Sequence, residues 1–110
     1  MPTKDPREPF SRLNVQEAKD MLASGAAVVD VREPHEYTAG HIPSATLIPV
    51  NSVYARRAEL PQDQDVIFVC AVGQRSALAA EMAAAAGLTQ IFSLDGGTEA
   101  WIQAGEPVDK

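Results

Sequence analysis

The sequence predicts an α/β domain of three layers, with helices on both faces of a central parallel sheet of four or five strands. Four short apolar runs, at 26–31, 45–50, 65–70 and 90–94, are too short to be helices. Segments with the composition or periodicity of helices separate them. Strands that are apolar throughout are buried on both faces, which is typical of a parallel sheet covered by helices on each side.

The first helix is expected between Asn14 and Gly25. Asn14 can cap the helix, Glu17 stands three residues later as in a capping box, and Gly25 can end it. The strand at 26–31 follows. The next stretch, 32–43, carries charges and prolines and is expected to be a long loop.

The second half of the chain continues the alternation of helices and strands. A short helix is expected at 51–60, after the second strand. The run DVIFVC at 65–70 gives the strongest strand signal. Helices are then expected at 76–86 and 98–104, before and after the strand at 90–94, because good helix formers in these segments are followed by glycine.

The length of 110 residues suits one domain, which is expected to span residues 10–106. Residues 1–9 hold three prolines and four charges and are expected to form a flexible N-terminal arm. Residues 107–110 are expected to form a C-terminal tail. Charged residues make up 22% of the chain, as in ordinary globular proteins, so disorder is expected only at the ends.

The net charge of −6 disfavours phosphate-rich partners, so neither nucleic acid nor an anionic membrane is expected as a partner. No run approaches the roughly 18 apolar residues of a membrane span. A single cysteine, Cys70, excludes an internal disulfide and a cysteine-built zinc site, and it suits a reducing, cytoplasmic location. His35 and Glu36 begin like the zinc-protease motif HExxH, but Ala39 stands in place of the second histidine, so no metal site is expected.

Cys70 ends the strongest predicted strand, and ligands of parallel α/β sheets bind beyond the carboxyl ends of the strands. Gly73 lets the following loop curl, so that its N–H groups and the positive end of the helix at Ser76 can face an anion. Arg75 adds a permanent positive charge in an otherwise acidic half of the chain. These features are expected to lower the pKa of the thiol and make the thiolate a nucleophile. The alternative is that Cys70 is a small buried hydrophobe.

The chain resembles the rhodanese family of sulfurtransferases from about Leu13 to Gly105. The matching segments are DVREPHEYTAGHIPSA at 30–45, CAVGQRS at 70–76 and GGTEAW at 96–101. Each segment alone is a moderate signal, but the three occur in the order and spacing of the family. The resemblance implies a rhodanese-like α/β domain with a central parallel sheet, which agrees with the fold predicted from the residues.

The resemblance also implies that Cys70 accepts a sulfane sulfur as a persulfide and passes it to a nucleophile. The small sulfur donor would be thiosulfate or another persulfide, and a thiophilic acceptor, cyanide or a thiol, would come from outside because there is no second cysteine. No cofactor is needed. Arg75 is expected to orient the anionic substrate, while inward N–H groups hold the transferred sulfur. The expected substrate-binding residues are Ala71, Val72, Gly73, Gln74, Arg75 and Ser76.

Polar residues beside the loop are expected to support it. In the family the DVR segment lies next to the active loop, so Asp30 and Arg32 are expected to form a charge-assisted network that fixes the surrounding loops, in preference to direct catalysis. Glu33 belongs with them. His41 is expected to hydrogen-bond a turn, with proton transfer as the alternative. The family usually has glycine at the position of Ser44, which leaves the conformation of that turn open.

Other functions remain as alternatives. Cysteine-based phosphatases and arsenate reductases share the order of strand, cysteine, anion-binding loop and arginine, but their loop has five residues between Cys and Arg, whereas this chain has four. A non-catalytic binding module is disfavoured because the loop cysteine is present. A carrier that moves sulfur from a protein donor to a protein acceptor is harder to exclude. Residues 71 and 72 are Ala and Val, so Arg75 is the only cation of the loop, and weak thiosulfate affinity is expected.

Overall fold

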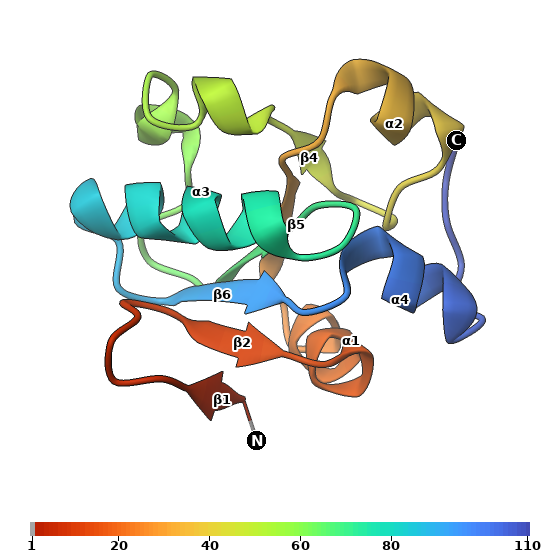
Figure 1. Cartoon of the computed structure of the whole chain (residues 1–110), viewed down its shortest axis with the longest axis horizontal. Helices are drawn as coiled ribbons and strands as arrows, with labels where there is room; N and C mark the ends of the chain where they lie inside the picture. The colour runs from red at the N-terminus through yellow and green to blue at the C-terminus, as the bar shows by residue number, and fades with distance from the viewer. Residues whose placement is uncertain (1) are drawn as a thin grey trace.

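The computed structural model describes residues 2–110, which form one six-stranded sheet with helices packed around it (Figure 1). The strands are β1 (Thr3–Lys4), β2 (Ser11–Leu13), β3 (Ala27–Asp30), β4 (Thr46–Leu47), β5 (Val66–Val69) and β6 (Ile91–Leu94). They lie in the order β1-β2-β6-β5-β3-β4. All neighbouring pairs are parallel except β1 with β2. The predicted parallel sheet is confirmed, with five parallel strands and one antiparallel edge strand.

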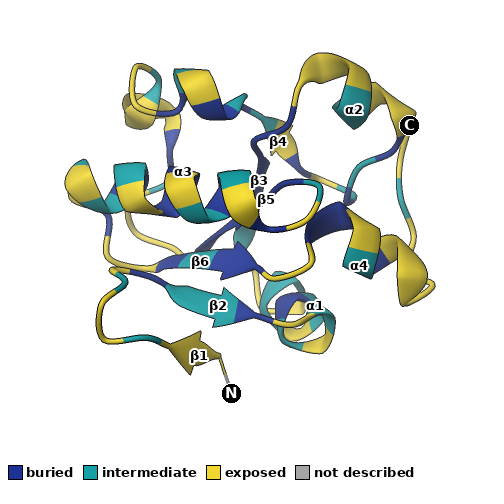
Figure 2. Ribbon diagram, viewed as in Figure 1, coloured by how far each residue is buried: buried dark blue, intermediate teal, exposed yellow. Residues whose placement is uncertain are grey.

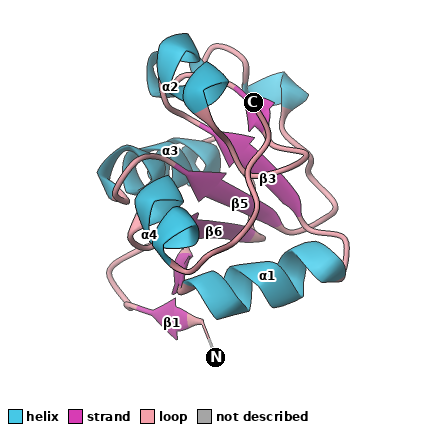
Figure 3. Ribbon diagram, turned by 90° about the vertical axis from the view of Figure 1, so that its right-hand side faces the viewer, coloured by secondary structure: helices cyan, strands magenta, loops and turns pink. Residues whose placement is uncertain are grey.

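Helices cover both faces of this sheet. They are α1 (Val15–Ala23), α2 (Pro34–Ala39), α3 (Gln74–Ala85) and α4 (Gly97–Gln103), with short 3-10 turns η1 (Val50–Ser52) and η2 (Arg57–Glu59). Buried residues of α3 and η1 share one core cluster, and buried residues of α1 and α4 share another. Figure 3 shows α3 and α1 on opposite sides of the strands. The three-layer architecture is therefore confirmed.

The register of β5 decides where the cysteine points. All four residues of β5 are buried, as Figure 2 shows for the centre of the sheet. Val66 and Phe68 belong to the core cluster under α3, whereas Ile67 and Val69 belong to the cluster on the other face. Because side chains alternate along a strand, Cys70 continues the first series and joins the cluster under α3. The sulfur is thereby directed toward the helix that follows it.

The structure differs most from the predicted elements in three places. The segment 32–43, expected to be a loop, contains the six-residue helix α2, which is too short to show helical periodicity. The helix expected at 51–60 is replaced by the two 3-10 turns η1 and η2. The strands β1 and β2 were not predicted, because segments of two and three residues carry too little pattern.

Both ends of the chain contact the domain. In the segment expected to be an arm, Thr3–Lys4 pairs with β2. In the expected tail, the carbonyl of Pro107 accepts a hydrogen bond from the Trp101 indole at 2.8 Å, and Asp109 forms an antiparallel bridge with His41. Composition alone does not reveal these contacts, because they depend on partners distant in sequence.

The turn before β4 contains a serine in a conformation that favours glycine. Ser44 has φ +72°, and among the described residues it is the only one other than glycine with a positive φ. A side chain in this region costs about 1–2 kcal/mol relative to an ordinary backbone conformation. Serine therefore holds this turn in a strained conformation that glycine would adopt without cost.

Ser44→Gly is expected to raise the free energy of unfolding by up to about 1 kcal/mol, because relief of strain exceeds the added flexibility of the unfolded chain. Urea unfolding measures the change. The matched control is Ser24→Gly, also at an exposed position but with φ −92°, where glycine relieves no strain and should lower stability. An unchanged or lower urea midpoint for Ser44→Gly would contradict the prediction.

Candidate active site

The sulfur of Cys70 lies in a tight turn between β5 and α3. Only 1% of the residue is exposed. The backbone N–H of Gly73 donates a hydrogen bond to Sγ at 3.0 Å, and the Ser76 hydroxyl oxygen lies 3.6 Å from Sγ. Gly73 has φ +107°, a left-handed conformation that lets the loop close around the sulfur and begin α3. This is the strand, loop and helix arrangement expected from the sequence.

The hydrogen bonds of the loop favour the thiolate. Burial raises the pKa of the Cys70 thiol because it penalises the charged form. Hydrogen bonds from the Ser76 hydroxyl and from backbone N–H groups of the loop, those of Ser76, Gly73 and Val72, act in the opposite direction and outweigh burial. The pKa of Cys70 therefore lies below its ordinary value, and the thiolate is more populated than in a free cysteine.

Ser76→Ala is expected to raise the pKa of the Cys70 thiol, because the thiolate loses the hydrogen bond from the hydroxyl while its burial remains. The thiolate fraction at neutral pH then falls. The rate of alkylation by iodoacetamide, measured against pH, should show its midpoint at higher pH than in the unchanged protein. Ser24→Ala, a change of an exposed serine at the end of α1, serves as the control and should leave the midpoint in place. A midpoint for Ser76→Ala that stays in place or moves down would contradict this assignment.

Ser93 is a second buried serine, and it forms a hydrogen bond with Ser76. The hydroxyl of Ser93, on β6, lies 2.8 Å from that of Ser76, and both residues are fully buried. When Ser93 donates this hydrogen bond, the proton of Ser76 is free to point at the sulfur. Sequence inspection missed Ser93; the only signal is a polar residue in the otherwise apolar run IFSL.

The start of α4 lies beside the loop between β5 and α3 (Figure 1) and holds its first two carbonyls. The N–H of Thr98 donates to the carbonyl of Cys70 at 2.8 Å, and the N–H of Glu99 donates to that of Ala71 at 3.1 Å. In a trans peptide the C=O and the N–H of the next residue point in opposite directions. Because their carbonyls are held by α4, the N–H groups of Ala71 and Val72 point away from α4, and that of Val72 interacts with the sulfur.

Gly97 makes this close approach possible. A Cβ atom at Gly97 would lie 2.4 Å from the carbonyl oxygen of Cys70 and 2.5 Å from that of Ala71. Only glycine leaves room for the loop to rest on the start of α4. The segment GGTEAW thus contributes to the site through its backbone, a role that the sequence analysis did not assign to it.

The remaining residues of the loop line its outer surface. Val72 is half exposed, Ala71 is partly buried and Gln74 is exposed. None of these side chains is charged. The loop therefore offers backbone N–H groups on its inner side and an uncharged, partly apolar surface outside.

The guanidinium of Arg75 is occupied by a carboxylate. Its Nη1 and Nη2 donate to Oε1 and Oε2 of Glu36 at 2.8 and 3.0 Å. The Arg75 guanidinium lowers the pKa of Glu36 to about 2, against a smaller opposing effect of burial, so the carboxylate stays ionised near neutral pH. Arg75 is the only cation of the loop, and its partner comes from α2, in the first half of the chain.

The supporting residues expected from the sequence form a network on the other face of β3. Asp30 is fully buried and accepts hydrogen bonds from Nε and Nη2 of Arg32, the shortest at 2.9 and 2.8 Å; Nη2 also donates to the carbonyl of Gly40. Alternation along β3 places Asp30 with Val28, on the face opposite to that of Cys70. These contacts connect the strand end to the end of α2.

Glu33 and His41 lie at the two ends of α2. The N–H of Glu33 donates to the Glu36 carboxylate at 2.9 Å. His41 stacks on the ring of Tyr37 at 3.7 Å, and its Nδ1 lies 2.9 Å from the carbonyl oxygen of the same residue. His41 thus contacts the turn after α2, and its described contacts do not include Cys70.

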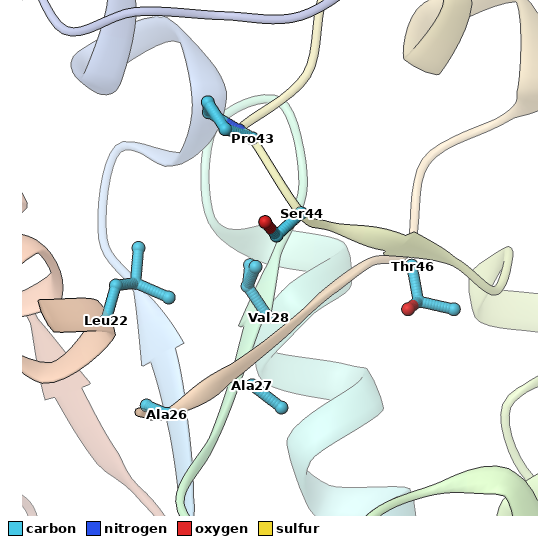
Figure 4. A pocket seen from close by; sticks show the side chains of 7 residues that line it. All are labelled: Leu22, Ala26, Ala27, Val28, Pro43, Ser44 and Thr46. Carbon is cyan, nitrogen blue, oxygen red and sulfur yellow. The ribbon is translucent and has the colours of Figure 1, made fainter. Parts of the chain in front are cut away.

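A cavity of about 240 Å³ lies elsewhere, between α1 and strands β3 and β4 (Figure 4). Its lining residues are Leu22, Ala26, Ala27, Val28, Pro43, Ser44 and Thr46. None of them belongs to the Cys70 loop, and none is a cysteine, a histidine or a charged residue. Among residues 2–110 no group of three or more His, Cys, Asp or Glu could hold a metal ion, and no helix is long and apolar enough to cross a membrane.

The comparisons with known proteins agree on one family. The family model of the rhodanese-like domain matches residues 14–104. Thiosulfate sulfurtransferase GlpE of Pseudomonas entomophila is 39% identical over 94 residues, 84% of each chain. The crystal structure of a rhodanese-related protein from Thermoplasma volcanium superposes with a TM-score of 0.83 at 33% identity, covering 89% of this chain and 96% of that one. The human single-domain sulfurtransferase gives a TM-score of 0.75 at 28% identity, covering 86% and 96%.

Proposed function

The chain belongs to the family of rhodanese-like domains, and from that premise we propose that it transfers a sulfane sulfur through a persulfide on Cys70. It is a rhodanese-type enzyme. The observation that carries the proposal is the single cysteine at the end of β5, whose sulfur accepts the N–H of Gly73 and whose pKa is lowered by the hydrogen bonds of its loop. A thiolate held in this way is a nucleophile.

The proposed reaction has two steps. The Cys70 thiolate attacks the outer sulfur of thiosulfate or of another persulfide, the S–S bond of the donor breaks, and sulfite or a thiolate leaves. The product is Cys70–S–S⁻. An external acceptor, cyanide or a thiol, then attacks the outer sulfur and the S–S bond of the persulfide breaks. The Cys70 thiolate is regenerated, and thiocyanate or a new persulfide leaves as the product.

The loop supplies the stabilisation that this intermediate needs. The outer sulfur carries a negative charge, and the inward N–H groups of the loop and the start of α3 favour an anion at that place. We assign substrate binding to the backbone of residues 71–76, with the side chain of Arg75 at the edge of the site. The single unpaired cysteine supports a reducing, cytoplasmic environment for this chemistry.

A protein-to-protein sulfur carrier is the second candidate. It is supported by Val72, which is 52% exposed in the loop that follows the buried Cys70, since an exposed apolar side chain suits contact with a protein. In that case a protein would replace the small donor or acceptor.

Intact mass spectrometry tests the proposed intermediate. After incubation with excess thiosulfate, or with a small persulfide, the protein should gain the mass of one sulfur atom, and a reductant should remove it. Addition of cyanide should release the sulfur as thiocyanate in an equal amount. No gain from either donor would overturn the proposal and favour a non-catalytic binding module. Discharge only to a protein acceptor would favour the carrier.

A further inference from the structure

We propose that Glu36 is a specificity-determining residue, which neutralises the one cation of the sulfur-binding loop and so favours monoanionic persulfide donors over dianionic thiosulfate. The inference rests on the proposed sulfur transfer at Cys70 and specifies the class of donor. Neither residue of the pair was expected to act in this way: Arg75 was assigned to substrate, and Glu36 was considered only as part of an incomplete zinc motif.

Arg75 and Glu36 form two parallel hydrogen bonds with each other. Both terminal nitrogens of Arg75 donate to the two oxygens of Glu36, in the bidentate geometry that is the strongest for these groups. Glu36 is itself anchored, because its Oε1 also accepts the N–H of Glu33 at the start of α2. The guanidinium is therefore oriented toward α2 by a fixed partner, with little freedom to turn toward a substrate.

The pair lies at the surface of the site. The side chains of Arg75 and Glu36 are 34% and 25% exposed, whereas Cys70 is almost fully buried. The charges of Arg75 and Glu36 cancel each other, so an approaching donor meets a pair with no net charge. The other residues of the loop add no charge, and residues 58–110 hold eight acidic residues against two basic ones. A dianion gains little from this surface before it reaches the backbone N–H groups.

A persulfide of a carbon compound suits the charge and polarity of this surface better than thiosulfate does. It presents one terminal sulfur with a single negative charge, and the carbon next to its inner sulfur is apolar. Its single charge suits the backbone N–H groups of the loop, and its carbon suits contact with the half-exposed side chain of Val72. The Cys70 thiolate then attacks the outer sulfur, the donor S–S bond breaks, the donor leaves as a thiolate, and Cys70 carries the persulfide.

Removal of the Glu36 charge should affect the two donors unequally. By Coulomb's law, removing the Glu36 charge changes the binding energy of a dianion twice as much as that of a monoanion at the same place. The fold-change in KM for thiosulfate is therefore the square of the fold-change for the persulfide. Glu36→Gln is expected to lower the KM for thiosulfate about tenfold and that for a monoanionic persulfide about threefold, with kcat little changed. Gln keeps the length and an acceptor oxygen of Glu36 and leaves the guanidinium charge uncompensated.

The experiment compares thiosulfate with the persulfide of 2-mercaptoethanol as donors, with cyanide as acceptor. KM and kcat are measured for the unchanged protein, for Glu36→Gln and for Glu81→Gln. Glu81 lies on the exposed side of α3, so this control makes the same change in net charge outside the site. Near 1 M salt, where the screening length falls to about 3 Å, the KM for thiosulfate of Glu36→Gln should approach that of the unchanged protein.

A measurement without substitutions guards against a variant that folds poorly. In the unchanged protein the KM for thiosulfate should not rise with salt, because the cation of the loop is already neutralised; a steep rise would show an active cation and overturn the inference. The inference would also be overturned if Glu36→Gln changed the KM of both donors by the same factor, or changed neither KM more than Glu81→Gln does. In each of these cases persulfide formation on Cys70 would still support the proposed function, whereas absence of that persulfide with either donor would overturn the function itself.

Discussion

Cys70→Ser is expected to lower sulfur transfer by at least about 1,000-fold, the scale on which enzymes lose activity when their nucleophile is removed. The hydroxyl of serine has nearly the shape of the thiol but is not ionised near neutral pH, and the loop contains no side-chain base that could activate it. The variant should also gain no sulfur mass from thiosulfate or from a small persulfide. Thiocyanate formation from thiosulfate and cyanide measures the loss of turnover.

A control measurement must show that Cys70→Ser still folds. Sγ accepts the N–H of Gly73, and a serine oxygen can accept the same hydrogen bond, so the thermal midpoint should remain close to that of the unchanged protein. A folded variant that still transfers sulfur would show that Cys70 does not carry the intermediate. Lost activity together with lost folding would be resolved by Cys70→Ala, which removes the nucleophile without burying a hydroxyl.

Gly97→Ala is expected to reduce kcat/KM about 100-fold while leaving the cysteine in place. The new Cβ would lie 2.4 Å from the carbonyl oxygen of Cys70, about 1 Å less than ordinary contact between carbon and oxygen. The loop must move away from α4, which weakens the hydrogen bonds from Thr98 and Glu99 that orient its peptide groups. A displacement of about 1 Å in a catalytic group can cost this much activity. Steady-state kinetics measure the effect.

Gly105→Ala is the matched control for the backbone conformation. Gly105 has φ +80° and Gly97 has φ +58°, so both variants place alanine in the left-handed region, but a Cβ at Gly105 meets nothing within 4 Å. The control should lose about 1 kcal/mol of stability and keep its activity. If both variants lost activity equally, or if Gly97→Ala kept full activity, the start of α4 would not orient the loop.

The sequence was sufficient for the features that depend on local pattern. The run DVIFVC predicts a buried strand because its residues are apolar on both faces, and β5 confirms it. The capping box of Asn14 and Glu17 is present at the start of α1. Helix α3 begins at Gln74, two residues before the predicted start, because Gly73 already takes the left-handed conformation that closes the loop. The helix α2 could not be predicted because six residues are fewer than two turns.

The partners of the site residues could not be predicted in the same way. Arg75 and Glu36 are 39 residues apart, and Ser76 and Ser93 are 17 apart; neither pair shares a periodic pattern. The sequence showed one cation in the loop and predicted a role in substrate binding. The fold supplies a carboxylate from α2 that changes the electrostatics of the same residue.

The amino-acid sequence by itself determined the parallel α/β class, the family and the position of the single cysteine at the end of a central strand. These follow from short-range periodicity and from three ordered segments. Only the tertiary structure decided the partners of the loop residues: α4 holds the carbonyls of Cys70 and Ala71, the serine of β6 contacts Ser76, and the carboxylate of Glu36 pairs with Arg75. The physical reason is that hydrogen bonds and ion pairs depend on distances of a few ångströms, and these distances are set by how helices pack across the sheet, which local residue order does not specify.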